Sequence, residues 1–268
     1  MMKLNEDPYL AENCGLAGSE ALLEVGAVPI SDLLQPEAAG EALDRYRELA
    51  RAEDRQVAAS FLSSWFGNVA IAHQYTLSVH DAAPDFSLDN LLLHIRRTEE
   101  GRTVIDFGVR EWRAEAAPAD EQQRTAWLVR QWQAFYGEQV RPLMQSLSSA
   151  SGLPIGQTWG QWPSRFFREI YWLCEANKDS LLSQRLQEDY RLLREADAIR
   201  IFGQRRNPFA VRIHRLKPLV PGRLTVMKSA CCQFHRVEGH DYCYTCPRLK
   251  PEQREREYEQ YITKFGLR

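Results

Sequence analysis

The sequence predicts an α+β protein with a mainly helical body, a small antiparallel β-hairpin or sheet, and a C-terminal module rich in loops. Three observations predict this class. Apolar residues recur at helical spacing through most of the first 200 residues, one strand-like stretch lies on each side of Gly101, and Gly and Pro interrupt the chain after Arg200. With 268 residues, of which 44% are hydrophobic, the chain can bury a sizeable core.

The helices of the body are expected where apolar residues lie three or four positions apart. The strongest early signal lies between Val57 and Phe66. Pro142 is expected to begin or bend a helix that ends in the Ser-rich loop 146–152. The other helices of the body are expected at residues 19–25, 37–50, 121–138, 164–176 and 181–199.

One β-hairpin is expected in the body. Residues 90–97 and 102–107 are rich in strand-forming residues, and the turn 98–101 between them contains the Gly that such turns need. Near the end of the chain, Pro251 is a first-turn residue for a closing helix at 251–265.

Charge divides the chain near residue 200. Residues 1–199 carry 19 Lys and Arg against 30 Asp and Glu, a net −11, whereas residues 200–250 carry 11 against two, a net +9. The expected parts are therefore a helical body at residues 1–200 and a basic module with its closing helix at residues 201–268. We expect an acidic partner or substrate to approach the basic module.

The expected location is the cytoplasm. No run of about 18 uninterrupted apolar residues is present, so we expect no transmembrane segment. The first residues include Lys3, Glu6 and Asp7 without a long apolar run, so we expect no secretory signal peptide. Because thiols stay reduced in the cytoplasm, clustered cysteines there predict metal ligands rather than disulfides.

Four of the six cysteines follow the pattern Cys-Cys-x10-Cys-x2-Cys, namely Cys231, Cys232, Cys243 and Cys246. Two cysteines separated by two residues can chelate a metal through a short turn, which Pro247 stiffens. Adjacent side chains point apart, so binding both Cys231 and Cys232 requires a bent backbone or two different irons. Four thiolates suit either Zn²⁺ or an iron–sulfur cluster, and the residues alone leave both open.

The remaining metal-ligand candidates have structural explanations. Cys174 is expected in the core, and Cys14 is expected to lack nearby partners. His235 and His240, between the cysteine pairs, are expected to face solvent or to support the ligands. Local hydrogen bonding is expected for three further residues, His73, His80 and Asp81.

The runs 228–235 and 241–248 together resemble the C-terminal motif of the FhuF-type ferric siderophore reductases. The resemblance covers about twenty residues and is specific because the adjacent cysteines, the ten-residue gap and the Cys-Pro step occur together. It implies a [2Fe–2S] cluster on the four cysteines. The chain departs from the family where Ser229 and Ala230 precede the first cysteine, since the nearest basic residue, Lys228, stands one position further back.

The resemblance also implies an activity. It is the one-electron reduction of Fe(III) in a ferric siderophore, of the hydroxamate type, with release of Fe(II) in the cytoplasm. An acidic electron donor such as a ferredoxin or flavodoxin would supply the electron, and the protein could contact the inner face of the membrane peripherally. No nucleophile or general base is required, and no catalytic residue is assigned.

Two groups of surface candidates remain open. The basic residues could dock the donor, attract an anionic chelate, or form a solvated face. Trp159 and Trp162 could line a cleft for the siderophore, with exposure expected for Trp159 at a break in the chain, whereas Trp172 is expected in the core. The basic residues are Arg205, Arg206, Arg212, Arg215, Lys217, Arg223 and Lys228.

Two other functions remain as alternatives. In the first, zinc pins the basic loop of a binding module that contacts nucleic acid. No clear recognition helix supports it, and the pI near 6.3 is low for such a role, so we expect no nucleic-acid partner. In the second, the chain is a non-enzymatic iron–sulfur protein that senses iron or oxygen.

Overall fold

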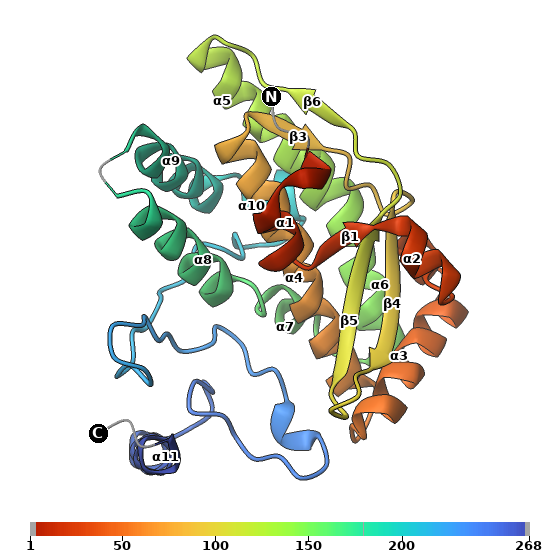
Figure 1. The fold of residues 1–268 in the computed structure, drawn as a ribbon, viewed down its shortest axis with the longest axis vertical. Helices are drawn as coiled ribbons and strands as arrows, with labels where there is room; N and C mark the ends of the chain where they lie inside the picture. Colours follow the sequence, from red (N-terminus) through yellow and green to blue (C-terminus); the bar gives the residue numbers. More distant parts are fainter. Residues whose placement is uncertain (1–3, 179, 266–268) are drawn as a thin grey trace.

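Helix α4 (Arg55–Val79) runs through the centre of the body, and the other elements are arranged around it (Figure 1). The structure is a computed structural model that describes residues 4–178 and 180–265. It confirms the α+β class with a mainly helical body. The described elements in chain order are η1 (Leu4–Glu6), α1 (Pro8–Glu12), β1 (Leu16–Gly18), α2 (Ser19–Glu24), β2 (Val28–Pro29), η2 (Ile30–Leu34), α3 (Pro36–Ala50), α4, β3 (Ala82–Pro84), β4 (Leu91–Arg97), β5 (Thr103–Val109), β6 (Ala114–Ala116), α5 (Glu121–Trp132), the π-helix η3 (Gln133–Val140), α6 (Arg141–Ser151), α7 (Ile155–Trp159), α8 (Pro163–Ala176), α9 (Leu181–Glu195), α10 (Ala198–Phe202), η4 (Phe234–Arg236) and α11 (Pro251–Phe265).

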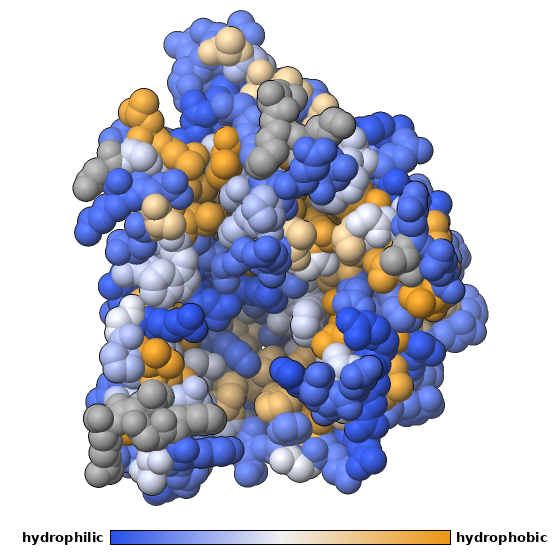
Figure 2. Space-filling view, in the orientation of Figure 1, coloured by the Kyte–Doolittle hydropathy of each residue, from blue (hydrophilic) through white to orange (hydrophobic). Residues whose placement is uncertain are grey.

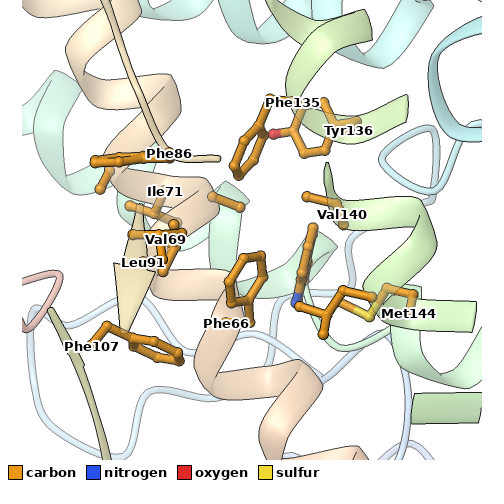
Figure 3. Packing of buried hydrophobic residues seen from close by; sticks show 14 of the residues in the cluster. Phe66, Val69, Ile71, Phe86, Leu91, Phe107, Phe135, Tyr136, Val140 and Met144 are labelled. Atoms are coloured by element: carbon orange, nitrogen blue, oxygen red, sulfur yellow. The ribbon is translucent and has the colours of Figure 1, made fainter. Parts of the chain in front are cut away.

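Helix α4 is buried on most of its surface, as expected for a helix with apolar residues around its whole circumference. Asp54 caps it by accepting hydrogen bonds from the N–H groups of Gln56 and Val57. On one side Phe66 meets the edge of Phe107 in the sheet, with ring centroids 5.8 Å apart, and Figure 3 shows the two rings in the shared core. The helix therefore joins the sheet to the helices packed on its other side.

The predicted hairpin is the centre of a four-stranded sheet with the order β1-β5-β4-β2. Strands β4 and β5 pair antiparallel from Leu91 opposite Val109 to Arg97 opposite Thr103. Strand β1 adds a parallel pair to β5, and β3 and β6 form a separate two-stranded sheet. Sequence analysis did not identify these added strands, because two or three residues carry too little alternation to be recognised.

The helical segment that follows the sheet is longer than predicted. Helix α5, the π-helix η3 and helix α6 are continuous, and Pro142 lies in the first turn of α6, as expected. The N–H of Arg141 reaches back five residues to the carbonyl of Tyr136, which is the π-helical pattern. The prediction of a Ser-rich loop at 146–152 is wrong. Leu147 is buried in the core, so the helix continues to Ser151 and ends at Gly152, whose φ of 73° is left-handed.

The last helix of the body is shorter than predicted. Helix α9 ends at Glu195 rather than residue 199, because the Asp197 side chain accepts hydrogen bonds from the N–H groups of Ile199 and Arg200 and starts the separate helix α10.

The chain from Gly203 to Lys250 contains only one short helical turn, η4, which confirms a segment rich in loops, and α11 confirms the closing helix. In Figure 1 this segment, drawn in cyan to blue, lies below α7 and α8. It touches the body through an isolated bridge between Ala52 and Val237. The domain boundary near residue 200 stays a prediction. No helix among the described residues has the length and apolar character needed to cross a membrane.

Candidate metal centre

The four cysteines of the C-terminal motif lie in two pairs, each with one cysteine from 231–232 and one from the Cys-x2-Cys turn. The Sγ atoms of Cys231 and Cys246 are 3.7 Å apart, and Cys232 and Cys243 lie close enough for each to shift the pKa of the other. Cys243 is half-buried, whereas the other three are buried. Among residues 4–178 and 180–265, no three His, Cys, Asp or Glu side chains gather as ligands of one metal ion. Each cysteine of the adjacent pair instead has its own partner from the Cys-x2-Cys turn.

The backbone turns sharply at Gln233, directly after the adjacent pair. This residue has φ 61°, a left-handed conformation that costs a non-glycine residue about 1 kcal/mol. Its N–H points back to the Sγ of Cys231 at 3.4 Å, and its side-chain oxygen accepts a 2.6 Å hydrogen bond from Arg236. These contacts hold the turn that leads the chain away from the two neighbouring thiols.

The Cys-x2-Cys turn is held by the closing helix. The N–H of Cys246 donates to the carbonyl of Cys243 at 2.8 Å, which forms the turn itself. Arg254, in the first turns of α11, donates to the carbonyl oxygens of Tyr244 at 2.5 Å and Cys246 at 2.9 Å. The helix thus positions the second pair of thiols, and Arg254 is the side chain through which it does so.

Two glutamines dock the first pair of thiols on the body. Gln157 in α7 and Gln161 just after it donate to the carbonyl oxygen of Cys231 at 2.8 and 3.3 Å. Beside them, Gly160 allows close packing, since a Cβ there would lie 2.8 Å from the Cβ of Ala230. Figure 2 shows the face that carries this segment hollowed between the segment and the body.

Arg236 makes the second attachment to the body. Its guanidinium donates to Glu53 at 3.0 and 3.1 Å and to Asp54, the cap of α4. The Glu53 N–H also donates to the backbone carbonyl of Arg236 at 3.0 Å. Part of the positive charge of the module is therefore paired with the acidic body.

Lys228 lies against one of the thiols. Its Nζ is 3.0 Å from the Sγ of Cys232. Burial opposes the charge of Lys228, but the nearby Cys232 and Cys243 raise its pKa. The hydrogen bond from Cys243, followed by the charge of Lys228, lowers the pKa of Cys232 to about 5. The same hydrogen bond raises the pKa of Cys243, and burial raises that of Cys231. Lys228 thus supplies the positive charge that the residues nearest the first cysteine lack.

The structure separates the seven basic residues that the sequence grouped together. Arg205 and Arg206 line a cleft beside Cys231. Arg215 lies over the ring of Tyr171, and Lys217 pairs with Glu255. Arg212 and Arg223 are exposed and belong to neither group.

The histidines and acids considered as ligands have other partners. His235 stacks on the ring of Tyr242, and His240 lies against Phe234, with centroid distances of 4.0 Å in both cases. For the other three residues the expected local hydrogen bonding is wrong, since the partners of His80 and Asp81 lie at least 43 residues away in the sequence. His80 bonds to Asp7 and Asp81 pairs with Arg124 and Arg185, but His73 is buried with its Nδ1 unpartnered and stacks on Phe135.

Three expectations about single residues need correction. Trp159 is 2% exposed rather than exposed, because it packs against the rings of Tyr136, Trp162 and Phe202. Trp172 and Cys174 are half-buried rather than in the core. Cys14 is a free thiol buried in the core cluster.

Sequence reasoning did not identify four residues that position the thiols. Gln157, Gln161 and Arg236 donate to residues at least 70 positions away, and Arg254 donates from the closing helix to the Cys-x2-Cys turn, so no local pattern encodes these contacts. Arg236 had a weak signal, since it adds to the basic charge between the cysteine pairs.

Comparison with known families identifies the motif. Residues 229–248 match the family model described as the FhuF 2Fe-2S C-terminal domain. The match contains all four cysteines and makes a [2Fe–2S] cluster the cofactor of this chain. A comparison with curated proteins found no match.

Replacement of Lys228 by Met is expected to lower the midpoint potential of the bound cluster by tens of millivolts. The ammonium 3.0 Å from Cys232 stabilises the added negative charge of the reduced state, and Met removes that charge while keeping most of the volume. A redox titration followed by electron paramagnetic resonance measures the shift. Lys250→Met, which removes an exposed charge from the same segment, serves as the control, and an equal shift in both variants would contradict the contact's role.

Proposed function

Because this chain carries an FhuF-type C-terminal [2Fe–2S] domain, we propose that it is a ferric siderophore reductase that reduces bound Fe(III) by one electron. The observation that carries the proposal is the meeting of four thiols in two pairs, within the matched residues, beside a cleft large enough for a chelate. The thiol of Cys243 is half-buried, so a partner can approach this end of the site.

The residues present fit the cofactor. A [2Fe–2S] cluster ligated by cysteines needs two thiolates for each iron. The proposed ligands are Cys231 with Cys246 on one iron and Cys232 with Cys243 on the other, following the two contacts. This assignment explains how adjacent cysteines serve one cluster, since each of them lies beside a different thiol of the Cys-x2-Cys turn.

The proposed reaction depends on the ligand preferences of iron. When bound, the cluster supplies single electrons. Hydroxamate oxygens are hard donors that hold Fe(III) tightly, so the gain of one electron by the substrate gives an Fe(II) complex that dissociates. The freed hydroxamate takes its proton from water, which agrees with the absence of any assigned general acid.

The chain's own residues prepare the site for this transfer. Lys228 and the N–H of Gln233 place positive charge and a hydrogen-bond donor on the sulfurs of Cys232 and Cys231. Both favour the more negative, reduced state of the centre. Gln157 and Gln161 keep the Cys231 end in place against the body.

The electron source in this proposal is an acidic protein such as a reduced ferredoxin or flavodoxin, in the cytoplasm. The exposed Arg212 and Arg223 belong to the same segment as the cysteines and can steer such a donor. Peripheral contact with the inner face of the membrane would bring the protein near incoming chelates and is part of the same proposal.

The activity is tested with the reduced holoprotein. We expect anaerobic protein to contain about two irons and two sulfides per chain, as a [2Fe–2S] centre requires. After reduction by one electron and removal of excess dithionite, added ferric hydroxamate should reoxidise the cluster and yield one Fe(II), trapped by ferrozine. Cys174→Ser should behave as wild type, whereas Cys246→Ser should lose cluster or rate. A colourless protein with one zinc, or a cluster that no ferric chelate reoxidises, would contradict the proposal.

The pairing of the thiols is tested in metal-free Cys231→Ser protein. Mild oxidation should join Cys232 to Cys243 and leave Cys246 free, because the contact partner of Cys246 has been removed. Chymotryptic cleavage after Tyr244 separates the two candidate partners for mass spectrometry. A disulfide between Cys232 and Cys246 would show that the assignment to irons is wrong.

Donor docking is tested by ionic strength. The rate of cluster reduction by an acidic ferredoxin should fall about tenfold or more between low salt and 0.5 M salt, because screening shortens the range of charge attraction. Replacement of both Arg212 and Arg223 by Gln should make this dependence shallower. A reduction rate that does not depend on salt would contradict electrostatic docking of the donor on this segment.

A further inference from the structure

A cleft of about 840 Å³ opens beside the proposed cluster ligand Cys231. We call it the module cleft. It lies between α6, α7, the loop 203–211 and the pair Ser229–Ala230. Because Ser229 and Ala230 directly precede Cys231, a molecule in the cleft lies within a few residues of the sulfur ligands. The volume is in the range typical of sites for small organic ligands.

The charged groups that line the module cleft are of one sign. Arg205 and Arg206 line it, and none of its described lining residues is Asp or Glu. Arg141 lies against Gly203, at the start of the same loop, and adds a third guanidinium nearby. Within the described part of the chain, neither Arg205 nor Arg206 has an ion-pair or hydrogen-bond partner. Both are therefore available to bind an anion, and a paired carboxylate suits the forked guanidinium geometry.

A second observation at the module cleft is independent of charge. Trp159 lines the cleft and is 2% exposed, yet its indole Nε1–H is buried without a hydrogen-bond acceptor. The buried indoles of Trp127, Trp132 and Trp162 donate at 2.8, 3.0 and 2.6 Å to acceptors within the protein. A buried Trp N–H is normally bonded, so the Nε1–H of Trp159 is an unused donor in the wall of the module cleft.

A smaller cavity of about 480 Å³ lies beside η4 and is one rival location. Its arginines include Arg51, which pairs with Glu238, and Arg97, which donates to the carbonyl of Gly101. Two of its arginines thus already have partners within the protein. Its volume is little more than half that of the module cleft.

We propose that the module cleft binds the ferric chelate and that it favours chelates with a net negative charge, such as hydroxamates that carry a free carboxylate, over neutral trihydroxamates. This inference rests on the proposed reductase function and adds to it the place and the charge of the substrate. Arg205 and Arg206 bind the carboxylate, Trp159 donates to a chelate oxygen, and Ser229–Ala230 separates the chelate from Cys231.

Binding is tested without electron transfer, by using Ga(III) in place of Fe(III). The probes are the anionic Ga(III) complex of a citrate-based dihydroxamate and the neutral Ga(III) complex of a cyclic trihydroxamate, titrated calorimetrically into the oxidised holoprotein. The anionic complex should bind about tenfold or more tightly than the neutral one, and Arg205→Gln with Arg206→Gln should remove most of that difference. The matched control, Arg212→Gln with Arg223→Gln, should leave it in place.

The location is tested by filling each cavity. Ser149→Trp, on the exposed end of α6, narrows the module cleft and should abolish binding, whereas Thr103→Trp narrows the smaller cavity and should not. An unchanged cluster absorption spectrum shows that each variant is folded. Equal affinity for the two complexes, an unchanged affinity in the double Arg205 and Arg206 variant, or a loss of binding only in Thr103→Trp would overturn the inference.

The outcomes also separate this inference from the proposed reaction. If the cluster is reoxidised by ferric chelates while the cleft variants bind Ga(III) complexes normally, the location is wrong and the function stands. If the anionic Ga(III) complex binds in the cleft while no ferric chelate reoxidises the cluster, the reductase function fails and the binding site stands.

Discussion

The attachment of the cysteine segment to the body is the constraint on which the rest of the site depends. Two side-chain amides, from Gln157 and Gln161, converge on the single carbonyl oxygen of Cys231, and Arg236 binds the acidic residues at the start of α4. The segment contains almost no regular hydrogen bonding of its own. These few contacts with the rigid central helices therefore decide where the thiols lie, and they also close one wall of the module cleft.

The structure shows which positive charges of the basic segment are paired within the protein and which are free to bind a partner. Taken as a whole, the basic segment indicated an acidic partner, but much of its charge is already used within the molecule. Arg236 pairs with the cap of α4, Lys217 with Glu255, and Lys228 with a thiol. The charge that remains available falls into two places, the module cleft and the exposed surface. A small anionic chelate and a protein donor can therefore use different residues of one basic segment.

The fold was predictable where the information is local. The helix around Phe66 and the hairpin around Gly101 follow from apolar spacing and turn chemistry, which act over a few residues. The Ser-rich stretch after Leu147 was misread because its buried face outweighs the poor helix propensity of serine. Trp159 was expected to be exposed at a chain break, but it packs against Tyr136 and Phe202 of other helices, and such contacts leave no local pattern.

The sequence by itself predicted the candidate ligands and, through the family motif, the cofactor class, because the identity and spacing of Cys231, Cys232, Cys243 and Cys246 are properties of about twenty consecutive residues. Only the tertiary structure decided which thiols meet, because Cys231 is docked by Gln157 and Gln161 from a distant segment and the second pair is held by Arg254 of the closing helix. The cleft also arises only in three dimensions, since its walls come from segments far apart in the chain. Chemistry that depends on residue type can be predicted from the sequence. The direction in which each side chain points depends on tertiary packing and can be seen only in the structure.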